Sequence, residues 1–161
     1  MDIVKLYLSP AHVYSGHFGR AAGTAPMVAK DQLHIRAGRG IEGDRYHEAP
    51  EGHLGQVTFF AEETWLRLRR SLGREDAGPG VFRRNIIVRG VDLNSLIGAE
   101  FAVQGLRFIG AAYCKPCFWM DESFAPGTLA ALTAWKAGGL RARALTDGCL
   151  SIAPELNRCS A

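Results

Sequence analysis

The sequence predicts a mainly β protein, folded as a closed or partly open β-barrel with two or more peripheral helices. Many short segments combine β-branched and apolar residues between glycine-rich or polar turns, which is typical of strands. Only two segments show helical periodicity, and short strands with few helices favour a sheet that curls toward closure. The chain has 161 residues, the length of one ordinary domain, so we expect residues 1–161 to form a single domain.

The strands are predicted from alternation and from β-branched content. In the stretch that begins at Leu106, Arg107 points away from Leu106 and Phe108 in an extended chain, as in a strand with one buried face. Near the C-terminus, Asp147-Gly148 separates two strand-like runs and predicts a hairpin. The expected strands are residues 3–8, 34–36, 56–60, 85–89, 100–103, 106–111, 142–145 and 149–152.

Two helices are expected, at residues 61–72 and 128–137. In the first, apolar residues recur at helical spacing, acidic residues stand at the start and arginines near the end, and Gly73 supplies the stop. In the second, Thr128 is the expected N-cap and Gly138-Gly139 the end.

Composition limits the classes of function. The net charge of +3 is mild and forms no basic stripe, so we expect no nucleic-acid partner. No span approaches the ~20 apolar residues of a transmembrane helix, and the alternating start does not resemble a secretion signal, so a cytoplasmic location is expected. Four cysteines are too few for a disulfide framework and favour reduced thiols.

The first candidate site segment is Gly40-Ile41-Glu42-Gly43-Asp44-Arg45-Tyr46-His47. Its glycines allow a tight turn that brings an acid, a permanent cation and an imidazole within four residues. Arg45 beside such a turn can bind a phosphate through two hydrogen bonds. The alternative is a surface turn in which Asp44 and Arg45 pair with each other or with neighbours.

The second segment is Val81-Phe82-Arg83-Arg84-Asn85-Ile86-Ile87-Val88. Arg83 and Asn85, two apart in an extended chain, are expected to project to the same face, where they can bind an oxyanion or a pterin amide edge. The alternative is that Asn85 caps a turn and the arginines are solvated.

The third segment is Tyr113-Cys114-Lys115-Pro116-Cys117-Phe118-Trp119, directly after a predicted strand. A Cys-x-x-Cys pair is found in redox motifs and in zinc sites, or it exposes one useful thiol. Zinc is disfavoured because no second ligand pair follows at suitable spacing, and a thioredoxin-like site is disfavoured because no clear helical run follows before Thr128. Lys115 favours a thiolate, whereas the alternative is two buried structural cysteines. The histidines at 12, 17, 34 and 53 lack partners at ligand spacing.

Taken in order, these segments resemble the MOSC family, named for the C-terminal domain of molybdenum cofactor sulfurases. Gly-Ile-Glu-Gly-Asp-Arg resembles the family's Gly-x-x-Gly-Asp-Arg signature, Arg-Arg-Asn-Ile resembles its Arg-x-Asn-Ile motif, and Cys-Lys-Pro-Cys resembles the segment with its characteristic cysteine. Residues 91–98 resemble the connector, and residues 140–148 the closing hairpin. The resemblance covers nearly the whole chain.

The resemblance implies a β-barrel-like fold around a molybdenum-pterin cofactor. Carried over by position, Cys117 is the metal ligand and the catalytic residue, Arg45, Arg83 and Asn85 contact the cofactor, and Lys115 lies near its phosphate or oxo groups. Relatives of the mitochondrial amidoxime-reducing type have a Pro-x-Lys-Ser segment after the first strand. Here the chain reads Ser9-Pro10-Ala11-His12-Val13, and His12 takes the place of the lysine in part.

Three functional hypotheses follow from the resemblance. The first is a small molybdoenzyme core that reduces N-hydroxylated or N-oxide compounds, with electrons from a separate reductase. The second is a carrier that delivers cofactor, or sulfur as a Cys117 persulfide, to an accepting protein. The third is a domain that keeps the fold without its cofactor. Pyridoxal phosphate is not expected in this chain alone, because no desulfurase domain accompanies it.

Overall fold

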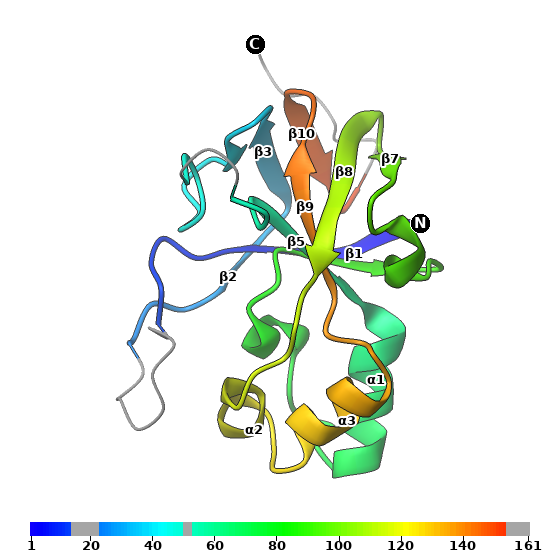
Figure 1. Cartoon of the computed structure of the whole chain (residues 1–161). Helices are drawn as coiled ribbons and strands as arrows, with labels where there is room; N and C mark the ends of the chain where they lie inside the picture. Colours follow the sequence, from blue (N-terminus) through cyan, green and yellow to red (C-terminus); the bar gives the residue numbers. More distant parts are fainter. Residues whose placement is uncertain (14–22, 50–52, 154–161) are drawn as a thin grey trace.

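The computed structural model describes residues 1–13, 23–49 and 53–153, and it confirms a mainly β fold (Figure 1). A seven-stranded sheet has the order β2-β1-β6-β5-β9-β8-β7, and a three-stranded sheet has the order β10-β3-β4. Within the described residues the edge strands β2 and β7 do not pair with each other, so the barrel is partly open. The strands are β1 Asp2–Leu8, β2 Val28–Lys30, β3 Gln32–Arg36, β4 Gly40–Ile41, β5 Val57–Ala61, β6 Ile86–Arg89, β7 Glu100–Val103, β8 Leu106–Tyr113, β9 Leu140–Ala144 and β10 Gly148–Ser151.

The main hydrophobic core is formed by the inward faces of these strands. Phe59 makes edge-on ring contacts with Phe101 and Phe108, at centroid distances of 5.5 and 5.6 Å, a geometry that aromatic pairs prefer. On β9 every second residue is buried, so Arg141 and Arg143 lie on the exposed side. The strand pattern thus places charged side chains outside the core.

The helices gather on one side of the sheets, at the bottom of Figure 1, around a second core cluster. The helical elements are α1 Glu62–Leu72, α2 Trp119–Ser123 and α3 Thr128–Ala134, with the 3-10 turns η1 Pro79–Phe82 and η2 Leu93–Leu96. Phe82 packs between Phe60 and Phe124 in this cluster. As predicted, Gly73 ends α1 in the left-handed conformation, with φ of 65°. None of the described helices is long and apolar enough to cross a bilayer.

The start of α3 differs from the prediction. Gly127, with φ of 93°, occupies the N-cap position, and Thr128 is already helical. The Thr128 hydroxyl donates to the Ala125 carbonyl instead of capping, and the Asp121 carboxylate accepts from the Leu129 N–H at 2.7 Å. The helix ends at Ala134, three residues before the predicted end. Helix α2, which supplies Asp121, was not predicted because five residues are too short to show a helical period.

The predicted hairpin at Asp147-Gly148 is wrong. Strand β9 has both edges occupied, by β5 and β8, so no edge is left for β10. The chain crosses at Asp147 to the smaller sheet, where β10 pairs with β3. The Asp147 carboxylate accepts a hydrogen bond from the Ala37 N–H at 2.7 Å, which ties the crossing to the end of β3. The Asp147-Gly148 pair favours a hairpin locally, but the pairing of β9 with β5 and β8 leaves no position for β10 beside β9.

Candidate functional site

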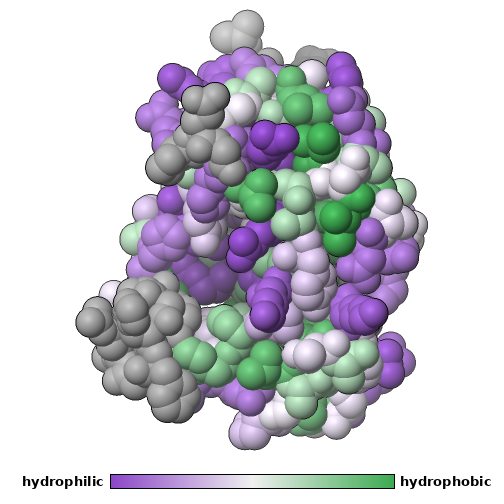
Figure 2. Space-filling view, viewed as in Figure 1, coloured by the Kyte–Doolittle hydropathy of each residue, from purple (hydrophilic) through white to green (hydrophobic). Residues whose placement is uncertain are grey.

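The three sequence segments meet at one cavity of about 280 Å³. On the face of the molecule seen in Figure 2, hydrophilic residues gather around a hollow between the strands and the helices below them. The residues that line the cavity are His12, Val13, Arg45, Tyr46, His53, Gly55, Thr58, Phe82, Arg83, Arg84, Cys114, Lys115, Cys117, Trp119, Met120 and Arg141.

Five of the six predicted site residues line this cavity, and one does not. His12, Arg45, Arg83, Lys115 and Cys117 all contribute to its wall, although they come from four separate parts of the chain. The sixth, Asn85, is fully buried and is not among the lining residues. Asn85 therefore supports the wall from behind and does not form part of its surface.

Asn85 uses its side-chain amide to connect β1, β5 and the Asp44 turn beneath the cavity. Its Oδ1 accepts from the Thr58 N–H at 3.2 Å and from the Thr58 hydroxyl at 2.7 Å. Its Nδ2 donates to the Tyr7 carbonyl at 3.3 Å and to the Asp44 carboxylate at 3.0 Å. Because buried amides must find hydrogen-bond partners, this arrangement fixes both the orientation of Asn85 and the position of Asp44.

Asp44 in turn fixes the turn that carries Arg45. Its carboxylate accepts from the backbone N–H groups of Ser9 and Tyr46, at 3.0 and 3.1 Å, and from the Arg45 guanidinium at 3.3 Å. The side chain of Asp44 is fully buried, so these bonds replace its hydration. The predicted alternative, pairing of Asp44 with Arg45, is thus present, but in the interior instead of on the surface.

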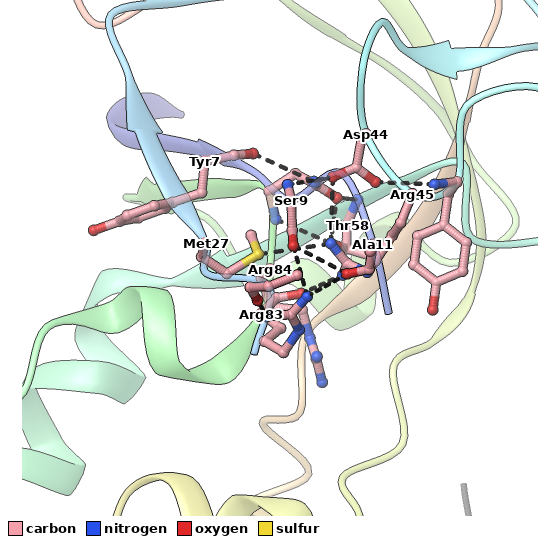
Figure 3. Close-up of polar contacts among 12 residues, drawn as sticks. Tyr7, Ser9, Ala11, Met27, Asp44, Arg45, Thr58, Arg83 and Arg84 are labelled. Carbon is pink, nitrogen blue, oxygen red and sulfur yellow. Dashed lines mark hydrogen bonds and ion pairs between the residues drawn. The ribbon is translucent and has the colours of Figure 1, made fainter. Parts of the chain in front are cut away.

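Arg45 and Arg83 are held by the backbone, as Figure 3 shows. Arg45 Nη2 donates to the Arg83 carbonyl at 2.9 Å. Arg83 donates to the Ser9 hydroxyl and to the carbonyls of Ala11 and Ala25, at 2.8, 2.9 and 3.0 Å. Arg83 itself is left-handed, with φ of 56°, so the extended geometry expected for Arg83 and Asn85 is wrong and the two side chains separate.

The two guanidinium groups repel each other in this wall. Burial, and next the charge of Arg45, lower the pKa of Arg83 to about 10, although Asp44 and Tyr46 act in the opposite direction. A bound anion would relieve this repulsion, because its negative charge favours both cations. The wall is therefore electrostatically suited to a negatively charged group.

The cysteine segment is the loop that runs from the end of β8 down to α2 (Figure 1). Cys114 is buried and its N–H donates to the Gly139 carbonyl at 2.8 Å, whereas Cys117 is exposed. The loop packs tightly on Gly138, where an added Cβ would lie 2.1 Å from the Cys114 carbonyl oxygen. Arg84 also holds Gly138, with donation to its carbonyl at 3.1 and 3.2 Å, so this arginine is structural and not solvated.

The cavity wall is strongly cationic. Among the described residues that line it, five are arginine or lysine and none is aspartate or glutamate. Three of these cations, Arg45, Arg83 and Arg84, donate to backbone carbonyls. Lys115 and Arg141 make no hydrogen bond or ion pair with another described residue, so their charges are available to a ligand.

Sequence reasoning missed several lining residues. His53 belongs to no motif, whereas Tyr46 and Arg141 stood in quoted segments, at residues 40–47 and 140–148, without an assigned role. The Tyr46 ring lies between two imidazoles, in an edge contact with His12 at 4.9 Å and stacked on His53 at 5.0 Å. No spacing pattern in the sequence connects these positions, because the contact depends on the fold.

Metal ligation by protein side chains alone has little support. Within residues 1–13, 23–49 and 53–153 no three His, Cys, Asp or Glu side chains form a cluster suited to a metal ion. His17 and Cys159 lie outside the described residues. A metal at this cavity would need most of its ligands from another source, with Cys117 as the exposed thiol.

Comparison with known families then identifies the fold. The family model of the MOSC domain matches residues 44–153, which include Arg45, Arg83 and Cys117. The chain belongs to the MOSC domain family. MOSC domains bind ligands related to the molybdenum cofactor. The matched range begins at Asp44, so His12 lies in front of it.

Solved structures have the same fold as this MOSC chain at low sequence identity. The YuaD protein from Bacillus subtilis has a TM-score of 0.69 and 16% identity, covering 93% of this chain and 90% of its own. YiiM from Geobacillus stearothermophilus has a TM-score of 0.67 and 13% identity, with 94% and 71% covered. YiiM from Escherichia coli has a TM-score of 0.61 and 17% identity, with 92% and 66% covered. Comparison with curated protein sequences gives no match.

Proposed function

We propose that this MOSC domain holds a molybdenum-pterin cofactor in the cavity, with Cys117 as the metal ligand. In this proposal the domain is the core of a small molybdoenzyme that reduces N-hydroxylated or N-oxide compounds, and a separate reductase supplies electrons. The observation that carries the proposal is one exposed thiol in a cavity whose described wall has five cations and no carboxylate.

The residues fit the chemistry of such a cofactor. A thiolate is a soft ligand and suits a metal that also takes sulfur ligands from the pterin. The cationic wall suits the phosphate of the cofactor, since guanidinium and ammonium groups bind phosphate oxygens through charge-assisted hydrogen bonds.

The size of the cavity limits how much of the cofactor it can bury. Its volume of about 280 Å³ lies just below the ~300–1,000 Å³ of pockets that bury most of a drug-sized ligand. A pterin cofactor would therefore remain partly exposed, with room for a substrate or a protein partner to approach. When bound, the cofactor supplies the redox chemistry of oxygen-atom removal.

The chain's own residues have separate tasks in this proposal. Cys117 ligates the metal, and the Cys114 segment, fixed by Gly139, holds the loop in place. Arg45 and Arg83 shape the wall and supply positive charge, while Asn85 positions Asp44 beneath them instead of touching the cofactor. His12 lines the cavity in edge contact with Tyr46, and the charge of Arg83 acts on its imidazole.

Metal analysis tests the proposal. Purified from cells competent in cofactor synthesis, the wild type should contain molybdenum close to stoichiometric with the chain, together with pterin fluorescence. Cys117→Ser should lose most of the metal and all turnover of an N-hydroxylated amidine. Cys149→Ser, which changes a buried cysteine on β10 away from the cavity, should keep both. A wild-type protein without molybdenum or pterin contradicts the proposal.

A second function, sulfur or cofactor delivery, is favoured by the exposure of Cys117 beside the buried Cys114. An exposed thiol is accessible to a protein that donates or accepts sulfane sulfur. Mass spectrometry of protein purified without reductant distinguishes the two functions. A persulfide on Cys117 in protein that binds pterin but does not turn over N-hydroxylated compounds supports the carrier.

A further inference from the structure

Arg141 is the least expected cation of the cavity. It lies on β9, between Thr58 of β5 and Ala112 of β8 in the register of the sheet. Thr58 also lines the cavity, and Ala112 lies three residues before Lys115 along the chain. The sheet therefore brings Arg141 to the start of the cysteine segment, on the exposed side of its strand.

The Arg141 side chain is positioned by the turn at Gly55. A Cβ added at Gly55 would lie 3.6 Å from Arg141 Cδ and 3.8 Å from its Cγ. The same Cβ would lie 3.3 Å from His53 Cε1, so the arginine and the imidazole both pack against this glycine. The aliphatic part of Arg141 thus packs next to His53 on Gly55. Its guanidinium has no hydrogen bond or ion pair with another described residue.

His53 presents a fixed hydrogen-bond donor at this place. The Gly55 N–H donates to His53 Nδ1 at 3.2 Å, so Nδ1 is an acceptor. A neutral imidazole that accepts at Nδ1 carries its proton on Nε2. Stacking on Tyr46 at an interplanar angle of 28° fixes the plane of the ring. The site therefore combines a guanidinium with a neutral N–H donor.

The other arginines of the wall are less free to bind an anion. Arg83 donates to three oxygens of the N-terminal segment, and Arg84 to the carbonyls of Phe82 and Gly138. A ligand that bound through these groups would have to compete with bonds already made within the protein. A ligand that binds to Lys115 and Arg141 breaks no hydrogen bond with another described residue.

We propose that Arg141, His53 and Lys115 form the phosphate-binding site of the cavity, and that Arg45 and Arg83 shape the wall without making the principal phosphate contacts. The proposal deepens the proposed function, since the pterin cofactor carries a phosphate. The ligand class is a phosphate dianion, which matches two cations and one neutral donor, with no carboxylate among the described lining residues.

Titration of inorganic phosphate into cofactor-free protein tests the site directly, because it needs neither molybdenum nor turnover. Calorimetry should show phosphate binding to the wild type that weakens at least about tenfold in Arg141→Met, the loss expected for one charge-assisted hydrogen bond. Arg143→Met is the matched control: it removes an exposed arginine from the same strand outside the cavity and should bind as the wild type does. In the wild type, the ¹⁵N signal of His53 Nε2 should shift on addition of phosphate.

The outcomes separate this inference from the proposed function. Wild type that binds no phosphate, or Arg141→Met that binds as tightly as Arg143→Met, overturns the inference even if molybdenum is present. Phosphate binding that depends on Arg141 in a protein that never acquires molybdenum supports the site and overturns the cofactor proposal alone.

Protein loaded with cofactor distinguishes the source of the phosphate. If the cofactor's phosphate occupies the site, the loaded protein should no longer bind inorganic phosphate. Loaded protein that still binds it through Arg141 identifies free phosphate as the ligand of this site.

Discussion

Asn85 illustrates how one side chain can support a whole site without touching a ligand. Its amide bonds to Thr58, Tyr7 and Asp44 leave none of its donors or acceptors for the cavity. The position of the cationic wall therefore depends on a buried residue that looked in the sequence like a direct ligand contact.

Replacing Asn85 by alanine should cost about 3 kcal/mol of unfolding free energy, because Asp44 and Thr58 lose a buried partner each. Urea unfolding measures this change. Asn94→Ala is the control, since Asn94 is exposed and its side chain donates to the Lys136 carbonyl alone among the described residues, and it should cost less than about 1 kcal/mol. Equal costs for the two variants would refute the supporting role of Asn85.

His12 should make stability depend on pH. Burial and the charges of Arg45 and Arg83 lower its pKa below the ordinary 6.5, although Asp44 acts the other way and His53 adds to the lowering. As pH falls below 6.5, His12 binds a proton in the unfolded chain but stays neutral in the folded protein. The free energy of unfolding therefore decreases until the pH lies below the lowered pKa of the folded state.

The comparison of variants isolates this contribution. The urea midpoint should fall less between pH 8 and pH 5 in His12→Gln than in the wild type. His34→Gln, which changes an exposed histidine on β3 away from the cavity, should retain at least the part of the pH dependence due to His12. A His12→Gln profile identical to that of the wild type would show that His12 contributes nothing to the pH dependence.

At the scale of residues, the sequence identified those that stand in motifs. Arg45, Arg83, Lys115, Cys117 and His12 do line one cavity. Arg141 and His53 were missed because their roles come from the packing of both side chains on Gly55, and such packing leaves no pattern in the local sequence.

At the scale of elements, the cysteine segment is positioned by the glycines that follow α3. Gly138 lies against the carbonyl of Cys114, and its N–H donates to the Tyr113 hydroxyl at 3.1 Å. The end of one helix and the start of β9 thereby determine where the loop after β8 can lie.

Gly138→Ala should displace this loop. An added Cβ would meet the Cys114 oxygen at 2.1 Å, which is backbone and can move only with the loop. We expect a loss of more than about 2 kcal/mol in stability and a changed rate of Cys117 alkylation. Gly78→Ala, where no atom lies within 4 Å, should change neither. Equal behaviour of both variants would exclude Gly138 as the support of the loop.

Strands were easier to predict than their partners. Most predicted strands agree with the structure within a few residues, because alternation and β-branched content are local properties. The hairpin at Asp147 failed because pairing depends on which sheet edges are still unpaired, and β9 has none within the described residues. Helix α2 was too short to show a period.

At the scale of the molecule, the partly open barrel brings distant segments to one cavity. Its wall is formed by the segment after β1, the Asp44 turn, the Arg83 turn, the cysteine segment and β9. The fold class was predictable from many short strands and few helices, whereas the order of strands was not, since no local feature fixes the crossing between the two sheets.

X-ray absorption at the molybdenum edge can show whether Cys117 ligates a cofactor-bound metal in this cavity, because it reports the sulfur atoms bound to the metal. If Cys117 is a ligand, molybdenum in the purified wild type should have one more sulfur neighbour than the residual molybdenum of Cys117→Ser. An equal number of sulfur neighbours in the two proteins, or a wild type without molybdenum, would contradict ligation of the metal by Cys117.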